Sequence, residues 1–164
     1  MNSEETSAVK ELADLLKEKG LTLAVAESCT GGLLGHLITS EPGVSAFFKG
    51  SVVAYANSVK VELLGVPFET IEEFGAVSIE CAEAMAKGAR EKLKSDIGVS
   101  ITGIAGPEGG SKDKPVGTVF ISLSRAKETI TEMLSCVGNR GQIKAQAALS
   151  ALSLIRKVLK SDAL

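Results

Sequence analysis

Three side chains with chemical potential follow one another in the segment AESCTGG at residues 26–32. Ser28, Cys29 and Thr30 each carry a hydroxyl or a thiol, which can act as a nucleophile or as a hydrogen-bond donor. Gly31 and Gly32 follow directly, and glycine lets the backbone approach a ligand closely. An ordinary helix-capping turn has the same composition, because Ser or Thr caps helices and glycine allows the bend. The segment is therefore a candidate site that needs support from elsewhere in the chain.

A serine nucleophile needs a base, and in the Ser-His-Asp triad that base is histidine. The only histidine is His36, which lies eight residues after Ser28. If the segment between them is mostly helical, the two are about 12 Å apart along the helix axis, which is too far for a triad. Cys29 lacks a histidine partner too; a helix start could lower its pKa, but buried packing is the common fate of cysteine. The remaining solution is a lysine base.

The segment YANSVK at residues 55–60 supplies such a lysine. Tyr55, the only tyrosine, stands at the predicted end of a strand, Asn57 can cap the next helix, and Lys60 lies on about its first turn. If this strand neighbours the strand before Ser28, both carboxyl ends open at one edge of the sheet, where ligands bind. Tyr55 and Lys60 can then converge on Ser28. The alternative is a core tyrosine and a surface lysine, so the hypothesis depends on the constellation.

Two further segments could contact a substrate. Thr102 ends a predicted strand, and the loop after it has glycines at 103, 106, 109 and 110, which allow tight folding around a ligand. This loop is neither a Walker A motif nor a GxGxxG fingerprint, so it predicts no nucleoside triphosphate or dinucleotide; a flexible turn is the alternative. Arg140, before the last helix, could bind a phosphate bidentately or could be an ordinary solvated arginine.

The elements that must position these residues alternate between helix and strand. Apolar periodicity predicts helices at residues 4–19, 31–40, 58–64, 78–95 (with Ser78 as N-cap) and about 140–160. It predicts strands at 21–28, 49–56, 96–102, 117–124 and 128–137, and loops at 66–77 and 103–116. This order predicts one α/β domain over residues 1–164, a three-layer α/β/α sandwich with a mostly parallel sheet and antiparallel edge strands near 117–137.

Composition limits the classes of partner. The 164 residues, 45% hydrophobic and 23% charged, are typical of one soluble globular domain. The net charge of −2 and the lack of a basic stripe argue against nucleic acid as a partner. No stretch reaches the ~18 apolar residues of a membrane span, and the charged, amphipathic N-terminus is not that of a signal peptide. We expect no membrane partner, and we expect a homo-oligomer.

Cysteine and histidine usage bears on compartment and metals. Cys29, Cys81 and Cys136 are odd in number, widely spaced and without a CxxC pair. This argues against a disulfide framework or a structural zinc site and favours a reducing cytoplasm. A single histidine excludes most histidine-based metal sites. We therefore predict a cytoplasmic protein without metal or cofactor.

Together these segments resemble the CinA C-terminal domain family, whose stand-alone members are nicotinamide mononucleotide deamidases. The resemblance covers nearly the whole chain after the first predicted helix, in family order, and AESCTGG combined with GIAGPxGGSxxKPVGT is very specific. The matching segments are AESCTGGLLGHLIT (26–39), FKGSVVAYANSVKVELLGV (48–66), GAVS (75–78), ITGIAGPEGGSKDKPVGTVF (101–120) and GNRGQIKAQAALSAL (138–152). It implies hydrolysis of nicotinamide mononucleotide to nicotinic acid mononucleotide and ammonia in the pyridine nucleotide cycle of NAD metabolism.

The resemblance also implies roles for individual residues. Ser28 becomes the nucleophile, Tyr55 and Lys60 its activating partners, and Thr102 and Arg140 substrate contacts. The full predicted substrate-binding set is Cys29, Thr30, Gly31, Gly32, Asn57, Thr102, Gly103, Gly106 and Arg140. Two positions depart from the family pattern in the predicted phosphate region: Asn139 stands where the family typically has Asp, and Lys144 where it often has Arg.

The predicted mechanism starts from a neutral Lys60, which accepts the Ser28 proton directly or through Tyr55. Ser28 attacks the carboxamide carbon, backbone N–H groups of residues 29–32 stabilise the oxyanion, ammonia leaves, and water hydrolyses the acyl-enzyme. The lysine pKa of about 10.4 must fall, through burial or a nearby positive charge such as the pyridinium of the substrate. The rival hypothesis is a non-catalytic nucleotide-binding module in which Lys60 stays charged. A metal-dependent amidase lacks a ligand set.

Overall fold

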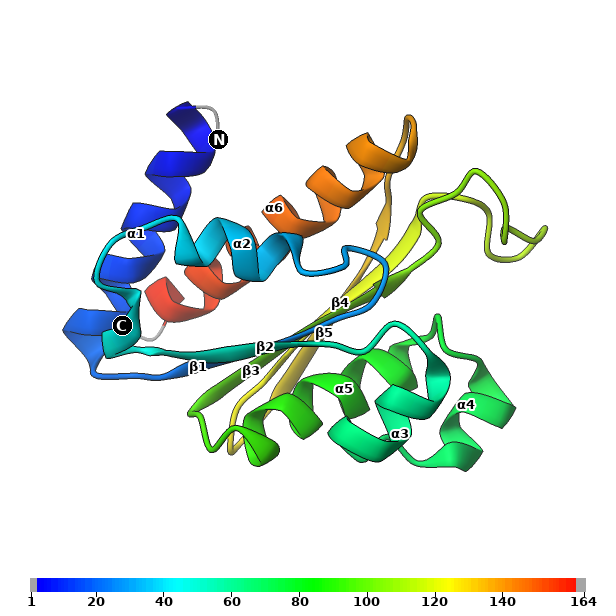
Figure 1. Cartoon of the computed structure of the whole chain (residues 1–164), viewed down its shortest axis with the longest axis horizontal. Helices are drawn as coiled ribbons and strands as arrows, with labels where there is room; N and C mark the ends of the chain where they lie inside the picture. Colours follow the sequence, from blue (N-terminus) through cyan, green and yellow to red (C-terminus); the bar gives the residue numbers. More distant parts are fainter. Residues whose placement is uncertain (1–2, 162–164) are drawn as a thin grey trace.

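The computed structural model of the chain describes residues 3–161. They form a five-stranded sheet in the order β2-β1-β3-β4-β5, with helices on both faces (Figure 1). The strands are β1 (Leu23–Glu27), β2 (Phe48–Val53), β3 (Ile97–Gly103), β4 (Thr118–Ser124) and β5 (Thr129–Ser135). The helices are α1 (Ser3–Lys19), α2 (Leu33–Thr39), α3 (Asn57–Leu64), α4 (Phe68–Phe74), α5 (Ile79–Lys92) and α6 (Arg140–Ser161), with a short 3₁₀ turn, η1 (Val44–Ala46), before β2.

The strand directions bring the candidate residues to one edge. Strand β1 is paired in parallel with both β2 and β3, so that Glu27 lies opposite Val53 on one side and Ile101 on the other. Strands β4 and β5 continue the sheet in antiparallel pairs. The carboxyl ends of β1, β2 and β3 therefore open at the same edge, as parallel pairing requires. The predicted three-layer α/β/α sandwich with antiparallel strands near residues 117–137 is confirmed.

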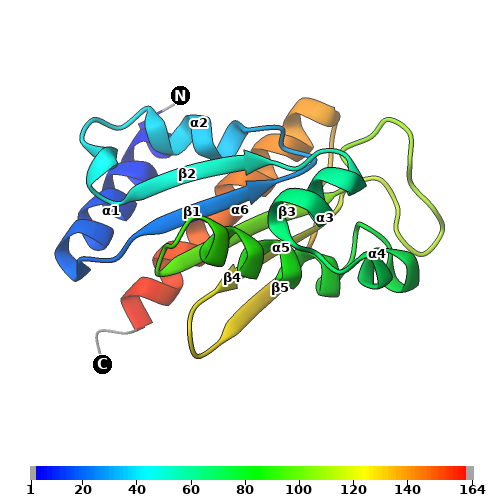
Figure 2. The same ribbon diagram turned by 60° about the horizontal axis from the view of Figure 1, so that its bottom comes forward.

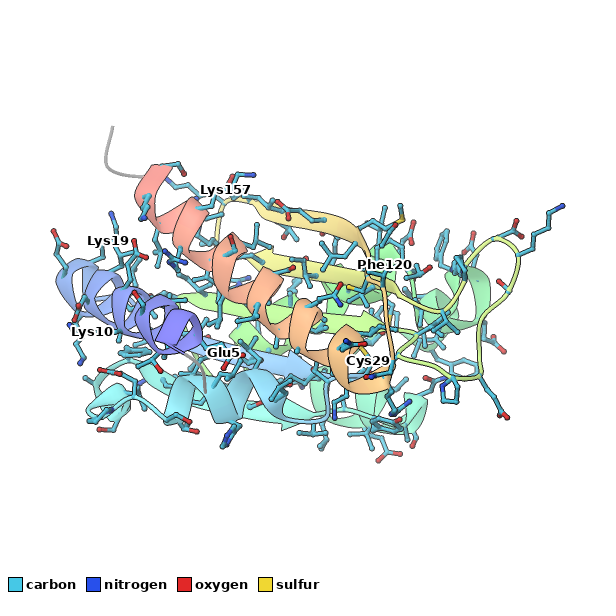
Figure 3. The ribbon with its side chains drawn as sticks, turned by 90° about the horizontal axis from the view of Figure 1, so that it is seen from above. Glu5, Lys10, Lys19, Cys29, Phe120 and Lys157 are labelled. Carbon is cyan, nitrogen blue, oxygen red and sulfur yellow. The ribbon has the colours of Figure 1, made fainter. Side chains whose placement is uncertain are left out.

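The two faces of the sheet are covered differently. Helices α1, α2 and α6 cover one face, and α3, α4 and α5 cover the other (Figures 1 and 2). Because side chains alternate along a strand, Leu23 and Val25 join the large core under α1 and α6, whereas Ala24 and Ala26 join the smaller core under α5. From above, α1 and α6 lie side by side, and Cys29 lies beside the first turns of α6 (Figure 3).

Glycine lets α5 pack very closely against the sheet. A Cβ atom built on Gly98 of β3 would lie only 2.1 Å from the backbone oxygen of Ala86 in α5. Further along β3, the hydroxyl of Ser100 donates to the Ala82 carbonyl at 2.6 Å and that of Thr102 to the Ala76 carbonyl at 2.7 Å, so the start of α5 and the residues just before it lie over the carboxyl end of β3. The linker between α4 and α5 thereby becomes part of the edge at which the candidate residues meet.

Two predictions about local structure were wrong. The segment 66–77, predicted as loop, contains helix α4, whose seven residues are too few for a clear helical period and include no buried side chain. Asn57 does not cap the next helix: Ala56 is the N-cap residue and no side chain caps the turn. By contrast, Ser78 is the predicted N-cap of α5, and its Oγ accepts a hydrogen bond from the Cys81 N–H at 3.1 Å.

Several observed element boundaries differ from the predicted ones by a few residues. The helix predicted from residue 31 begins at Leu33, because Gly31 and Gly32 have φ angles of +63° and +98°. Such angles suit glycine and do not continue a right-handed helix. The strand predicted to reach residue 56 ends at Val53, so Tyr55 lies in the connection that follows it. No helix within residues 3–161 is long and apolar enough to cross a membrane.

Candidate active site

Ser28 and Lys60 meet at the carboxyl edge of the sheet. Ser28 is the first residue after β1, and its N–H donates to the Ile101 carbonyl of β3 at 2.9 Å. Lys60 extends from α3, and its Nζ lies 3.1 Å from the Ser28 Oγ. The two side chains are buried, with exposed fractions of 8% for Ser28 and 1% for Lys60. The convergence of these two residues was predicted from the order of the strands.

The Lys60 amine is surrounded by oxygen atoms that carry no formal charge. Its Nζ donates to the backbone carbonyls of Ala54 at 2.9 Å and Tyr55 at 3.2 Å, in addition to its contact with Ser28. Among the described residues no acidic side chain forms an ion pair with it. Burial disfavours the charged form and lowers the pKa of Lys60, while the nearby thiols of Cys81 and Cys29 act in the opposite direction.

The three oxygen neighbours of Lys60 can be satisfied by either protonation form of its amine. A neutral lysine has two N–H donors and one lone pair, whereas the ammonium form has three donors. The carbonyls of Ala54 and Tyr55 can only accept, and they take the two N–H groups. Across the remaining 3.1 Å, the ammonium form donates its third N–H to the Ser28 Oγ, whereas in the neutral form the Ser28 hydroxyl can donate its proton to the lone pair. The geometry therefore suits a lysine that removes a proton from serine.

Tyr55 lies at the rim of the site. Its ring is 58% exposed, and its hydroxyl accepts a hydrogen bond from the Arg140 guanidinium at 2.8 Å. A second Arg140 nitrogen donates to the Gly106 carbonyl at 2.6 Å, so Arg140 ties the start of α6 to the glycine-rich loop. Within the described residues the Tyr55 hydroxyl makes no hydrogen bond to Ser28 or Lys60. Its role in proton transfer stays a prediction.

A cavity of about 270 Å³ opens above Ser28 and Lys60. Its floor is polar, and its walls come from the glycine-rich loop after β3 and from the linker between α4 and α5. The lining residues are Ser28, Cys29, Tyr55, Asn57, Lys60, Ala76, Val77, Thr102, Gly103, Ile104, Ala105, Gly106, Glu108, Gly109 and Arg140. Convergent polar groups at the bottom of a partly apolar hollow are typical of a small-molecule site.

Nine residues were predicted to bind substrate, and the cavity includes six of them. These six are Cys29, Asn57, Thr102, Gly103, Gly106 and Arg140. The other three lie beside the cavity: Thr30 is buried with its hydroxyl turned away, and Gly31 and Gly32 are in the turn behind it. The hydroxyl of Thr102 is already engaged, since it donates to the Ala76 carbonyl at 2.7 Å.

Glu27 was missed by the sequence analysis although it holds the Ser28 turn together. Its side chain is fully buried, and its two oxygens accept five hydrogen bonds. The donors are the hydroxyls of Thr30 (2.7 Å) and Ser51 (3.1 Å) and the backbone N–H groups of Gly32 (3.1 Å), Leu34 (3.0 Å) and Gly35 (2.8 Å). A carboxylate at the end of an otherwise apolar strand, directly before a glycine turn, is the signal that could have identified it.

This network decides which backbone groups are free for chemistry. The Gly32 N–H is bound to Glu27, and the Gly31 N–H donates to the Ser28 carbonyl at 3.1 Å. The backbone N–H groups of Cys29 and Thr30 donate to no backbone carbonyl or side-chain oxygen within residues 3–161. Of the four amides predicted as oxyanion donors, these two have no oxygen acceptor, and of the two residues only Cys29 lines the cavity.

The thiol beside Ser28 is held in its protonated form. Burial raises the pKa of Cys29 to about 11, and the charge of Glu27 contributes in the same direction. A thiol with this pKa is a poor nucleophile near neutral pH, because the thiolate is the reactive species.

His36 lies exposed on α2 and outside the cavity lining. Between residues 3 and 161 no three His, Cys, Asp or Glu side chains group closely enough to hold a metal ion.

The two departures from the family pattern lie near the start of α6, outside the cavity lining. Asn139 forms a reciprocal cap: its Oδ1 accepts from the Gln142 N–H at 3.1 Å, and its own N–H donates to the Gln142 Oε1 at 2.8 Å. Asn and Asp are comparable N-caps, so the departure retains this role. The Lys144 ammonium lies over the Ser28 turn, 3.7 Å from where a Cβ on Gly31 would be.

The sequence of this chain is similar to those of known proteins. A sequence model of the CinA C-terminal domain matches residues 5–159. The chain belongs to this family. The CinA-like protein of Dictyoglomus thermophilum is 49% identical over 155 residues, which are 94% of this chain and 38% of that protein. The CinA-like protein of Geobacter metallireducens is 50% identical over 150 residues, 92% of this chain and 36% of that protein. The chain thus spans less than two fifths of these relatives.

Solved CinA-superfamily structures have the same fold over almost the whole chain. A competence-damaged protein (CinA) superfamily protein from Klebsiella pneumoniae 700603 superposes with a TM-score of 0.93 at 30% identity, covering 98% of this chain and 99% of that one. The competence/damage inducible protein CihA from Agrobacterium tumefaciens gives 0.92 at 33% identity, covering 98% of both chains. The likeness extends over the elements that form the cavity.

Proposed function

We propose that this CinA-family chain is an amidohydrolase that converts nicotinamide mononucleotide to nicotinic acid mononucleotide and ammonia with a serine–lysine pair. The observation that carries the proposal is the buried Lys60 amine, which has no carboxylate partner within the described residues and lies 3.1 Å from the Ser28 hydroxyl at the floor of a cavity. The nucleotide substrate comes from the family resemblance, and the chemistry comes from this pair.

In the first half of the proposed reaction, neutral Lys60 takes the proton of Ser28 while the serine oxygen attacks the carboxamide carbon. The new C–O bond turns the carbonyl oxygen into an oxyanion, which the backbone N–H of Cys29, a residue of the cavity lining, stabilises. The Lys60 ammonium then gives its proton to the amide nitrogen, the C–N bond breaks, and ammonia leaves. An acyl ester on Ser28 remains.

In the second half, water replaces ammonia. Lys60, neutral again, removes a proton from a water molecule that attacks the ester carbon, and returns that proton to the Ser28 oxygen as the C–O bond breaks. Both halves need the amine in its neutral form at the start. Burial of Lys60 among uncharged oxygens supports this requirement, because it lowers the lysine pKa.

The rim of the cavity supports a substrate with an anionic group. Arg140 is exposed at the cavity mouth and is held by Tyr55 and Gly106, with its guanidinium nitrogens 2.8 Å and 2.6 Å from these acceptors. A fixed guanidinium of this kind is a suitable partner for phosphate. The proposed orientation therefore places the carboxamide on the floor and the phosphate towards Arg140.

The decisive experiment measures ammonia release from nicotinamide mononucleotide by the wild-type chain. Free nicotinamide and nicotinic acid mononucleotide serve as comparison compounds, because the first lacks the ribose phosphate and the second lacks the amide. The proposal expects stoichiometric ammonia and nicotinic acid mononucleotide. Binding of both nucleotides without ammonia would instead favour the non-catalytic binding module.

A further inference from the structure

Lys114 connects the two walls of the cavity. It lies in the loop after β3, and its ammonium donates to the backbone carbonyls of Phe74 at 3.0 Å and Val77 at 2.7 Å. These acceptors are 40 and 37 residues away in sequence; Phe74 is the last residue of α4, and Val77 itself lines the cavity. Loop and linker lie at the same end of the molecule, where α4 is drawn (Figures 1 and 2).

The linker has an unusual hydrogen-bonding pattern. The four successive backbone carbonyls of residues 74–77 each accept a hydrogen bond from a side chain. The donors are Lys114 to Phe74, Ser78 to Gly75 (2.8 Å), Thr102 to Ala76 (2.7 Å) and Lys114 again to Val77. Side chains from β3, from the loop and from the start of α5 thus hold this short segment in place. Lys114 is the one loop side chain that does so within residues 3–161.

The loop that carries Lys114 is shaped by its own hydrogen bonds. At its base, the Ile104 N–H donates to the Thr118 carbonyl and the Gly117 N–H donates to the Ile104 carbonyl, at 2.9 Å and 2.8 Å. Near its tip, Ser111 and Lys114 form a turn in which the Lys114 N–H donates to the Ser111 Oγ at 3.0 Å. The Lys114 side chain is therefore not needed to form the loop, but it joins the loop to the linker.

The walls joined in this way include four apolar residues, beside Glu108 of the loop, which also lines the cavity. Ala76 and Val77 come from the linker, and Ile104 and Ala105 come from the loop. None of these four residues is aromatic or charged. They therefore offer aliphatic contact to a ring, while the hydrogen-bonding groups lie on the floor of the cavity. Aliphatic side chains on both walls, with hydrogen-bonding groups on the floor, suit a heteroaromatic ring that carries a carboxamide.

We propose that Lys114 is a positioning residue that holds the linker and the loop at a set distance and so shapes a slot for a flat heteroaromatic ring. The inference deepens the proposed amidohydrolase function and depends on it for the identity of the ring. Lys114 touches neither Ser28 nor Lys60 within the described residues, so it acts on substrate fit and leaves the proton transfer unchanged.

The test compares Lys114→Met with Lys112→Met. Methionine keeps most of the side-chain length but cannot donate, and Lys112 is an exposed lysine of the same loop with no hydrogen bond or ion pair in the described part of the chain. Lys114→Met removes the two hydrogen bonds to the linker, and we expect KM for nicotinamide mononucleotide to rise about tenfold, with kcat within about twofold of wild type. Lys114→Arg still has N–H donors for both carbonyls, so its KM should stay close to the wild-type value. Lys112→Met should match wild type.

A second readout separates this inference from the proposed activity. Amide hydrogen exchange in the peptides covering residues 74–78 should become about tenfold faster in Lys114→Met, while exchange in α5 stays slow. This result supports the positioning role of Lys114 even if the wild-type chain releases no ammonia, a finding that would overturn the proposed function alone. Unchanged exchange and KM, a fall in kcat at constant KM, or loss of slow exchange in α5 would each overturn the role of Lys114.

Discussion

At the scale of single residues, the site depends on how burial shifts the pKa values of the side chains beside Ser28. Lys60 is buried without a carboxylate partner in the described structure, which lowers its pKa, and Cys29 is buried with its pKa raised to about 11. Burial therefore disfavours the charged form of each group, making the amine a better base and the thiol a worse nucleophile. Ser28, next to the amine, is left as the nucleophile of the proposed reaction.

The first prediction compares Ser28→Ala with Cys29→Ala. The serine variant should lose ammonia release by a factor of about 10⁴ or more, because the attacking oxygen is gone, and should melt close to the wild-type temperature. Cys29→Ala should keep most of the activity, since the protonated thiol takes no part. Steady-state ammonia assays and thermal melts measure both. If the cysteine variant is the inactive one, the nucleophile has been misassigned.

The second prediction concerns the charge of Lys60. A base must be deprotonated, so kcat/KM should rise with pH through the ionisation of Lys60, at a pKa below the ordinary value of 10.5. Lys60→Arg should fold but lose about 10² or more in kcat, because arginine stays protonated. pH–rate profiles of wild type and variant measure this. An arginine variant with near-native kcat and a raised KM would make Lys60 a substrate-binding cation instead.

At the scale of elements, the turn between β1 and α2 is built around one carboxylate. Glu27 joins β1, β2 and the first residues of α2 through five hydrogen bonds, and it stands directly before the proposed nucleophile. The Glu27 oxygens accept hydrogen bonds from backbone N–H groups that would otherwise be unpaired at the start of the helix. The carboxylate thereby determines which amides of the turn remain without an oxygen acceptor.

The third prediction tests this turn with Glu27→Gln. The amide group of glutamine would face N–H or O–H donors, leaving buried groups unsatisfied, so we expect the free energy of unfolding to fall by about 2–4 kcal/mol. Activity should fall as well, because the turn carries Ser28 and the proposed oxyanion donor, the N–H of Cys29. Ser51→Ala is the matched control and should cost about 1 kcal/mol, since it removes one of the five donors. Denaturant unfolding measures both; equal losses would refute the central role of Glu27.

At the scale of the whole molecule, the cavity is assembled from segments that are far apart in the chain. Ser28 follows β1, Lys60 lies on α3, and Arg140 begins α6, while the walls come from the α4–α5 linker and the loop after β3. No one of these elements contains the site. Side-chain contacts such as those of Arg140 and Lys114 hold the parts together across the cavity.

The fourth prediction follows from the chemistry that this assembly would perform. Every proposed step uses Ser28, Lys60 and backbone N–H groups, so ammonia release should be unchanged after exhaustive treatment with chelators. The measurement compares chelated enzyme, untreated enzyme and chelated enzyme supplied with single divalent metals. Loss of activity that one added metal restores would contradict the serine–lysine mechanism.

By itself the sequence determined the order of the elements and the edge at which the site would form. The apolar period and the Ser78 cap predict α5, and the succession of strands and helices predicts parallel strands whose carboxyl ends meet. Because Ser28 and Lys60 both come after strands that end at this edge, the sequence predicted that they would meet. These are properties of local pattern and chain order, which a single sequence contains.

Only the tertiary structure decided what surrounds these residues. Glu27 is held by Ser51 from a different strand, and Lys114 is bonded to carbonyls 37 and 40 residues away. Helix α4 and the burial of Lys60 likewise have no clear local pattern. The physical reason is that burial and long-range hydrogen bonds depend on which surfaces pack together, and this packing lowers the pKa of Lys60 and gives the cavity its walls.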